Sequence, residues 1–313
     1  MRSTLALAAA VIAAPLALAQ TSSSAKRGLC YVSTSDSSSD DAIWDGSDSD
    51  LTWYYNYEAT PTSGIDGSKL GFVPMQWGAP SSDTDMTFYN SVKGLIDGGA
   101  NITHVLGFNE PDGCANGGSC VDAETAAATW IREIEPLKTK YGLVLGAPAV
   151  TGAPAGFTWL QNFFTACAGN CSADFIPVHW YGNFEGLASH VGQVNATYPN
   201  MTMWVTEYAF ADGSLSESQD FYNTSASWLD SLDYVTHYSY FGAFRSDVSN
   251  VGPNAAMLTQ KGELTDIGAW YLGQKATGKK PKGGKHSSSG AAQVAQMSGW
   301  AAVVVGAMMW TLT

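Results

Sequence analysis

Residues 104–112 read His-Val-Leu-Gly-Phe-Asn-Glu-Pro-Asp, an apolar run that leads directly into a carboxylate. The run from His104 to Phe108 predicts a short buried strand of a parallel sheet, with Asn109 and Glu110 at its C-terminal end. Similar runs bounded by turn residues recur before and after it. The eight expected strands are Gly28 to Val32, Leu51 to Tyr57, Gly71 to Trp77, His104 to Phe108, Leu143 to Ala147, Phe175 to Tyr181, Met201 to Glu207, and Val235 to Phe244.

Helical patterns separate most of these strands. One begins at Asp122 and should end or kink at Pro136, because proline lacks a backbone donor and clashes with the preceding turn. The Ser- and Asp-rich stretch 33–50 predicts only a short helical turn near Ile43. The other expected helices are Met86 to Ile96, Phe157 to Ala168, Gly186 to Val194, Ser216 to Leu232, and Leu264 to Leu272. This α/β alternation favours a single (β/α)8 TIM barrel, in which chemistry gathers at the C-terminal strand ends.

Composition excludes several classes of protein. Apolar residues make up 45% of the 313 residues, enough to fill a large core and too many for a disordered chain. Fifteen basic residues against 28 acidic ones give a net charge of −13, the wrong sign for holding nucleic acid phosphates. So acidic a chain is not attracted to anionic lipid by charge. We expect a monomer without nucleic acid partners.

Both ends of the chain resemble targeting signals. Arg2, the apolar run Leu5 to Leu18 and the closing Ala-Leu-Ala at 17–19 predict a secretory signal peptide over residues 1–19. Residues 274–290 predict a disordered Gly/Lys/Ser-rich linker. Residues 291–313 are expected to be a glycolipid (GPI) anchor signal that is removed, which favours membrane attachment only through lipid. An uncleaved membrane helix is the alternative. The predicted location is the cell surface or cell wall.

Cysteines and glycosylation triplets agree with export. Cys114 with Cys120, and Cys167 with Cys171, are candidates for two short-loop disulfides. Cys30 is then left over, and a buried free thiol is favoured over a reactive nucleophile. The candidate glycosylation sites are Asn101, Asn170, Asn195, Asn200 and Asn223. No cysteine and histidine spacing resembles a metal site, and neither a metal nor an organic cofactor is expected.

Two of the expected strands end in a glutamate, Glu110 after the fourth and Glu207 in the seventh. Glycosidic-bond hydrolysis requires two carboxyl groups across a cleft, one that protonates the leaving oxygen and one that attacks or activates water. We expect partial desolvation and the charge of Glu207 to keep Glu110 protonated, with Glu207 ionised. Asn109 is expected to bond the sugar hydroxyl beside the reacting carbon. The alternative is that each glutamate only forms an ion pair at the rim.

Three stretches of the chain resemble glycoside hydrolase family 128. They are Gly-Phe-Asn-Glu-Pro-Asp at 107–112, Trp-Val-Thr-Glu at 204–207, and Lys-Arg-Gly-Leu at 26–29. The resemblance spans residues 26–273 and implies a (β/α)8 endo-β-1,3-glucanase that works with retention. It implies that Glu110 is the acid/base, Glu207 the nucleophile, and that Asn109 carries over with Glu110. Cys30 departs from the pattern, where alanine is expected, and Lys26-Arg27 has a dibasic processing site as its alternative interpretation.

Aromatic side chains at strand ends are candidates for binding sugar rings, which offer apolar faces. Period-two geometry places His179 and Tyr181 on one face of their strand and Trp180 on the other. We expect His179 and Tyr181 to reach the nucleophile or the sugar, with a core histidine as the alternative. Trp77 is expected in a stacking subsite or packed beneath a loop. The remaining substrate-binding candidates are Tyr54, Tyr208 and Tyr240. Tryptophans in helical patterns are expected in the core: Trp44, Trp130, Trp159, Trp228 and Trp270.

Together with the paired glutamates, the resemblance to family 128 therefore implies a retaining endo-β-1,3-glucanase that acts on cell-wall β-1,3-glucan. One alternative is a cell-surface protein that binds or senses β-glucan with little turnover. Another is a glycosidase for β-1,4 or β-1,6 linkages, because the Asn-Glu-Pro motif is shared by many barrel glycosidases.

Overall fold

The computed structural model describes residues 23–283, so the predicted signal peptide, the end of the linker and the anchor signal lie outside the described residues. The fold is α/β and is built around a five-stranded parallel sheet whose strands follow one another in chain order. Its strands are β4 (His104–Leu106), β5 (Val144–Gly146), β6 (Phe175–Tyr181), β7 (Thr202–Ala209) and β8 (Val235–Tyr240). Buried apolar side chains from these strands form much of the core.

A second parallel sheet contains β1 (Gly28–Cys30), β2 (Trp53–Tyr55) and β3 (Gly71–Phe72) in that order. Single parallel bridges connect the two sheets at both edges, Arg27 with Tyr238 and Met75 with Leu106. Each of the eight expected strand segments thus contains a strand. Several are shorter than expected because the chain turns away after two or three paired residues.

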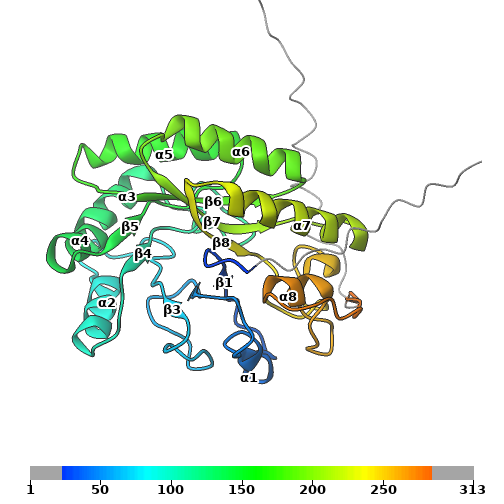
Figure 1. The fold of residues 1–313 in the computed structure, drawn as a ribbon. Helices are drawn as coiled ribbons and strands as arrows, with labels where there is room; N and C mark the ends of the chain where they lie inside the picture. The colour runs from blue at the N-terminus through cyan, green and yellow to red at the C-terminus, as the bar shows by residue number, and fades with distance from the viewer. Residues whose placement is uncertain (1–22, 284–313) are drawn as a thin grey trace, which may run out of the picture.

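Helices follow the strands, and Figure 1 shows α5, α6 and α7 along the outside of the five-stranded sheet. The first helical turns, α1 and η1, confirm the short helical segment expected near Ile43. The helical elements are α1 (Ser37–Asp40), η1 (Asp41–Ile43), α2 (Thr87–Asp97), α3 (Ala123–Thr129), η2 (Trp130–Ile134), α4 (Glu135–Tyr141), α5 (Pro154–Cys167), α6 (Phe184–Thr197), α7 (Leu215–Ser231), η3 (Pro253–Ala255) and α8 (Asp266–Tyr271). No helix within 23–283 is long and apolar enough to cross a membrane.

The helix that begins after Asp122 does not end at Pro136. It passes through the π-helical turn η2 and continues as α4 to Tyr141. Pro136 lies in the first turn of α4, where a missing backbone donor is tolerated. The π-helical turn lies directly before the proline, and of the two outcomes expected at Pro136 the stop is wrong.

The tryptophans assigned to the core divide into two groups. Trp44 and Trp130 are almost completely buried, as expected. Trp159, Trp228 and Trp270 are half-buried and pack against the edge of the core. Trp180 packs away from the glutamates, with its ring stacked on His190 of α6.

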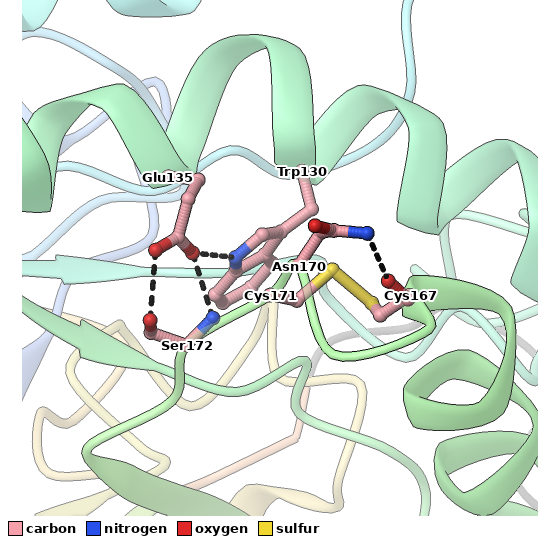
Figure 2. The surroundings of a disulfide bond; sticks show 6 residues. All are labelled: Trp130, Glu135, Cys167, Asn170, Cys171 and Ser172. Atoms are coloured by element: carbon pink, nitrogen blue, oxygen red, sulfur yellow. Dashed lines mark hydrogen bonds between the residues drawn. A yellow bond between two sulfur atoms is a disulfide. The ribbon is translucent and has the colours of Figure 1, made fainter.

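Both expected disulfides are present, Cys114–Cys120 and Cys167–Cys171. The second closes the turn between α5 and β6, where Glu135 accepts hydrogen bonds from Trp130 and from Ser172 (Figure 2). Cys30 is a free, buried thiol. Among the candidate glycosylation sites, Asn101, Asn170 and Asn200 are exposed, while Asn195 and Asn223 are half-buried in helices.

The basic pair Lys26-Arg27 is held within the folded body. The Lys26 ammonium donates to the carbonyls of Leu229, Asp230 and Leu232 at the C-terminal end of α7. Arg27 is 2% exposed and donates to Tyr238 and to the carbonyl of Trp270. This environment supports the strand interpretation of the pair over a processing site.

The first residues of the predicted linker, 274–283, contain neither helix nor strand but are hydrogen bonded to the body. The backbone amide of Gly278 donates to Asp266, and Lys282 exchanges two hydrogen bonds with the Ser246 hydroxyl. Composition predicts that this stretch lacks a core of its own. Residues 274–283 are held instead by hydrogen bonds between their backbone groups and side chains of the folded domain.

Acid is expected to destabilise the fold through His237, whose ring stacks on Trp204 at a centroid distance of 3.8 Å. Burial, with a smaller effect of nearby His104, lowers the pKa of His237 to about 4. The unfolded chain therefore binds the proton more tightly, so the free energy of unfolding falls as pH drops below about 6.5 and levels off below about 4, by on the order of 3 kcal/mol. Melting temperatures of the native protein and of His237→Gln between pH 7 and pH 4 test this. A native slope no steeper than that of the variant contradicts it.

Candidate active site

Glu110 follows β4 in a turn with an unusual backbone. Its φ of 40° lies in the left-handed region, and its amide donates to the carbonyl of Ala149 at 2.7 Å. Such a conformation is costly for a residue with a side chain and persists only where the surroundings fix it. Glu110 is thereby held at the C-terminal edge of the five-stranded sheet.

Glu207 lies in β7 and is 5% exposed. The neighbouring strand β6 pairs with β7 so that His179 is opposite Glu207, after a register shift between Val178 and His179. The three side chains Glu110, His179 and Glu207 each offer an atom, and these atoms lie within 4.8 Å of one another. Residues far apart in the sequence therefore meet at one site.

His179 lies between the two carboxyl groups. Its Nδ1 is 3.1 Å from Glu110 Oε1 and 3.4 Å from Glu207 Oε2. Burial alone lowers the pKa of His179, but the charge of Glu207 and the hydrogen bond to Glu110 outweigh it, so its pKa is raised. A cationic imidazole here would stabilise the carboxylate of Glu207.

Three tyrosine hydroxyls donate to Glu207, the longest of these hydrogen bonds coming from Tyr55 at 3.5 Å. Tyr57 donates to Oε1 at 2.6 Å and Tyr181 to Oε2 at 2.5 Å. Burial raises the pKa of Glu207 and Glu110 raises it further, while His179 and the hydroxyls of Tyr57 and Tyr181 lower it; the net direction is upward. Because a tyrosine hydroxyl donates to each of its oxygens, Glu207 accepts hydrogen bonds on both. This is the arrangement of a carboxylate held in place for nucleophilic attack.

Of the sequence-predicted residues, the structure brings Glu110, Glu207, His179 and Tyr181 together. Asn109 lies beside Glu110 and is 4% exposed; its Nδ2 donates to the carbonyl of Gly117. Its Oδ1 is buried without a partner in the part of the chain that the structure describes. An amide oxygen in that state can accept a hydrogen bond from a bound ligand.

Three of the predicted substrate-binding tyrosines do not reach the glutamates. Tyr54, Tyr208 and Tyr240 are each 0% exposed, so a sugar in solution cannot contact them and the prediction is corrected. Tyr54 packs on Phe72, and Tyr208 packs on Tyr240 on the outer face of the sheet. The reason is strand alternation: Glu207 points inward, so its neighbour Tyr208 must point outward.

Sequence reasoning named Tyr55 among the aromatics at the end of the second strand but gave it no specific role, and it missed Tyr57, which follows β2. Tyr55 donates to the carbonyl of Thr206, and Tyr57 continues on the same face to reach Glu207. Tyr57 also contacts the Cys30 thiol at 2.9 Å. Period two separates Tyr55 and Tyr57 from Tyr54, but the pattern alone does not say which face is inward. Trp77, in contrast, is 43% exposed after β3, so its role in a stacking subsite stays a prediction.

Removing the Tyr57 or the Tyr181 donor is expected to move the acidic limb of activity. Tyr181→Phe should raise the pKa of Glu207 further, because a hydrogen bond to the ionised form is lost. We expect the acidic limb of kcat/KM to shift upward by about one pH unit, given the strength of a hydrogen bond to a charged group. Tyr54→Phe is the control, because the Tyr54 hydroxyl is buried without a partner within residues 23–283. Equal pH profiles for the two variants would contradict this assignment.

Comparison with known proteins identifies the family. Residues 28–271 match the family model described as the glycosyl hydrolase catalytic core. The chain belongs to this family. Alkali-sensitive linkage protein 1 of Schizosaccharomyces pombe is 32% identical over 258 residues, which cover 80% of this chain. The match covers only 44% of that relative, so the chain spans less than half of its length.

Solved structures of family 128 enzymes resemble this member of the catalytic-core family. An endo-β-1,3-glucanase from Lentinula edodes is 25% identical with a TM-score of 0.65, covering 79% of this chain and 99% of that one. A curdlan-specific exo-β-1,3-glucanase from Blastomyces gilchristii is 30% identical with a TM-score of 0.60, covering 79% and 97%. These matches confirm the family 128 resemblance seen in the sequence.

An endo-β-1,3-glucanase from Amycolatopsis mediterranei is 28% identical as a glutamate variant with laminarihexaose, with a TM-score of 0.60 and coverage of 80% and 100%. A second variant of that enzyme carries a substitution at another glutamate. The two replaced glutamates are 97 positions apart, the same spacing that separates Glu110 from Glu207.

Proposed function

We propose that this member of the family is a retaining endo-β-1,3-glucanase that hydrolyses cell-wall β-1,3-glucan. The observation that carries the proposal is the approach of the Glu110 and Glu207 carboxyl oxygens to within 4.8 Å. Retaining glycosidases hold their carboxyl groups about 5–5.5 Å apart, whereas inverting enzymes leave room for water at roughly 6.5–9.5 Å. The β-1,3-glucan specificity is supported by the family 128 structures and by the shared glutamate spacing.

The proposed reaction takes two steps. Glu207 attacks the anomeric carbon while Glu110 gives its proton to the departing glycosidic oxygen, which leaves a sugar ester on Glu207. Glu110 then removes a proton from water, and the water oxygen displaces Glu207 from the anomeric carbon. Tyr57 and Tyr181 hold Glu207 in place for attack. The side-chain oxygen of Asn109, Oδ1, accepts a hydrogen bond from the sugar hydroxyl beside the reacting carbon.

The two sheets are proposed to form one closed (β/α)8 barrel. The parallel bridges at Arg27 and Met75 support this closure, because they continue the strand order across both gaps. A barrel explains why Glu110 and Glu207, on strands that are not neighbours, meet at the C-terminal ends. Trp77 would stack on a glucose ring at the rim.

The proposed location is outside the cell, with attachment through a lipid anchor. Two disulfides support an oxidising compartment, because cytosolic thiols are kept reduced. Exposed Asn101, Asn170 and Asn200 are proposed to carry glycan. A monomer held beside the wall would act on the wall's own polymer.

The function is tested with the protein expressed through a secretory pathway and incubated with laminari-oligosaccharides. We expect shorter β-1,3-linked products, released from internal bonds, and proton NMR should show that the first product keeps the β configuration. Binding without detectable hydrolysis would favour the glucan-binding alternative. Cleavage only of β-1,4 or β-1,6 oligosaccharides would overturn the proposed linkage.

A further inference from the structure

The loop after Glu110, residues 113–120, returns to the turn that carries the acid. We call it the clamp loop; the disulfide Cys114–Cys120 closes it. Its backbone bonds back to the turn at both ends: Gly113 N donates to the Glu110 carbonyl at 2.9 Å, and Ser119 N donates to the Asn109 carbonyl at 2.9 Å. The loop therefore contacts both residues of the Asn-Glu pair directly.

The clamp loop also fixes which way the Asn109 amide faces. A carbonyl oxygen can only accept, so the Gly117 carbonyl must receive the Nδ2 of Asn109, at 3.0 Å. The Oδ1 of Asn109 then points elsewhere and is the buried atom without a partner in the described residues. The loop thus leaves free the atom that the proposed reaction needs.

Several positions in this segment have positive φ angles, which a residue with a side chain keeps only where its surroundings fix them. The φ angles are positive at Glu110 (40°), Asn116 (53°), Gly117 (97°) and Cys120 (50°). Gly118 packs so tightly that an added Cβ would lie 2.3 Å from the Gly113 carbonyl oxygen. A cross-link across six positions limits the alternatives that the loop can adopt. Without the disulfide, the turn at Glu110 loses one of the constraints that keep its backbone in this conformation.

We propose that the disulfide-closed clamp loop is a positioning element that orients Asn109 and holds Glu110 at the leaving-group oxygen. The inference rests on the proposed glycosidase function and adds to it residues that do not touch substrate. It assigns to Cys114–Cys120 a role in the chemical step. The second disulfide, Cys167–Cys171, lies before the first residue of β6, whereas Tyr181 ends that strand, so we assign it no such role.

The two disulfides offer a matched pair of variants. Cys114→Ser/Cys120→Ser is expected to lower kcat on laminari-oligosaccharides at least tenfold, with KM changed less than about threefold. Cys167→Ser/Cys171→Ser opens a loop of similar size and is expected to keep kcat within about twofold. Equal losses of kcat in the two variants would overturn the proposal.

Leaving-group dependence separates positioning of the acid from a general structural defect. A dinitrophenyl β-laminaribioside releases a phenolate that needs no proton, so a displaced Glu110 matters little for its first step. The loss of kcat/KM, which reports the first step, on breaking the Cys114–Cys120 bond should be at least fivefold smaller with this substrate than with the oligosaccharide. The same loss on both substrates, or no loss on either, would refute the clamp.

A second variant keeps both cysteines in case the first does not fold. Gly118→Ala displaces the loop through its new Cβ and should show the same dependence on the leaving group. Native protein that hydrolyses neither substrate would instead refute the proposed function. That result is distinct from a clamp variant that equals an active native enzyme.

Discussion

Replacing Glu207 with Gln is expected to lower kcat on β-1,3-glucan by roughly 10⁴-fold or more, because the amide cannot form the glycosyl ester. Gln has the same shape as Glu, and a tyrosine hydroxyl that faces the new NH2 group can turn and accept from it. The hydrogen bonds of Tyr57 and Tyr181 can therefore be kept, so the fold should be retained. Steady-state kinetics with laminari-oligosaccharides and a melting curve measure both quantities. Activity within tenfold of native would remove Glu207 from the nucleophile role.

Replacing Glu110 with Gln should give a different pattern. Loss of the acid is expected to lower kcat by about 10²–10⁴-fold for natural glucan. With a dinitrophenyl glucoside the first step should survive, so the glycosyl-enzyme accumulates, and added azide should restore turnover as the β-glycosyl azide. A β-glycosyl azide from Glu207→Gln, together with an α-glycosyl azide from Glu110→Gln, would exchange the two roles.

Replacing Arg27 with Met is expected to destabilise the protein by about 3–5 kcal/mol, because buried partners lose their charge and donors. Arg27 is 2% exposed, forms an ion pair with Asp50 at 3.4 Å and donates to the carbonyl of Tyr271 at 3.2 Å. It also lies at the bridge to Tyr238 that joins the two sheets. The melting temperature should fall by roughly 10 °C, as read by thermal unfolding.

The control for Arg27 is an exposed ion pair of the same chain. Lys279 pairs with Glu263 at 3.0 Å, and both side chains are about half exposed. Lys279→Met should change the free energy of unfolding by less than about 0.5 kcal/mol. Similar melting temperatures for the Arg27 and Lys279 variants would show that the buried guanidinium does not hold the two sheets together.

Prediction from sequence succeeded where a local pattern has one structural meaning. Apolar runs that end in Glu110 and Glu207 predicted strands, and small-loop cysteine spacings predicted both disulfides. The alternation of His179 and Tyr181 succeeded because Glu207 in the adjacent strand pairs with His179. The prediction that Tyr54 binds substrate failed, because its strand neighbours are also aromatic and the local sequence does not show which face of the strand points inward.

The sequence by itself determined which residue types could carry chemistry: a glutamate after each of two apolar strands, a histidine beside a tyrosine, and cysteines near enough to pair. It did so because strand periodicity and short-loop closure depend only on neighbours along the chain. Only the tertiary structure decided that Tyr57 bonds to Glu207 and contacts Cys30, and that Tyr208 and Tyr240 do not face the site. Those outcomes depend on strand register and sheet curvature, which are set by packing among residues distant in sequence.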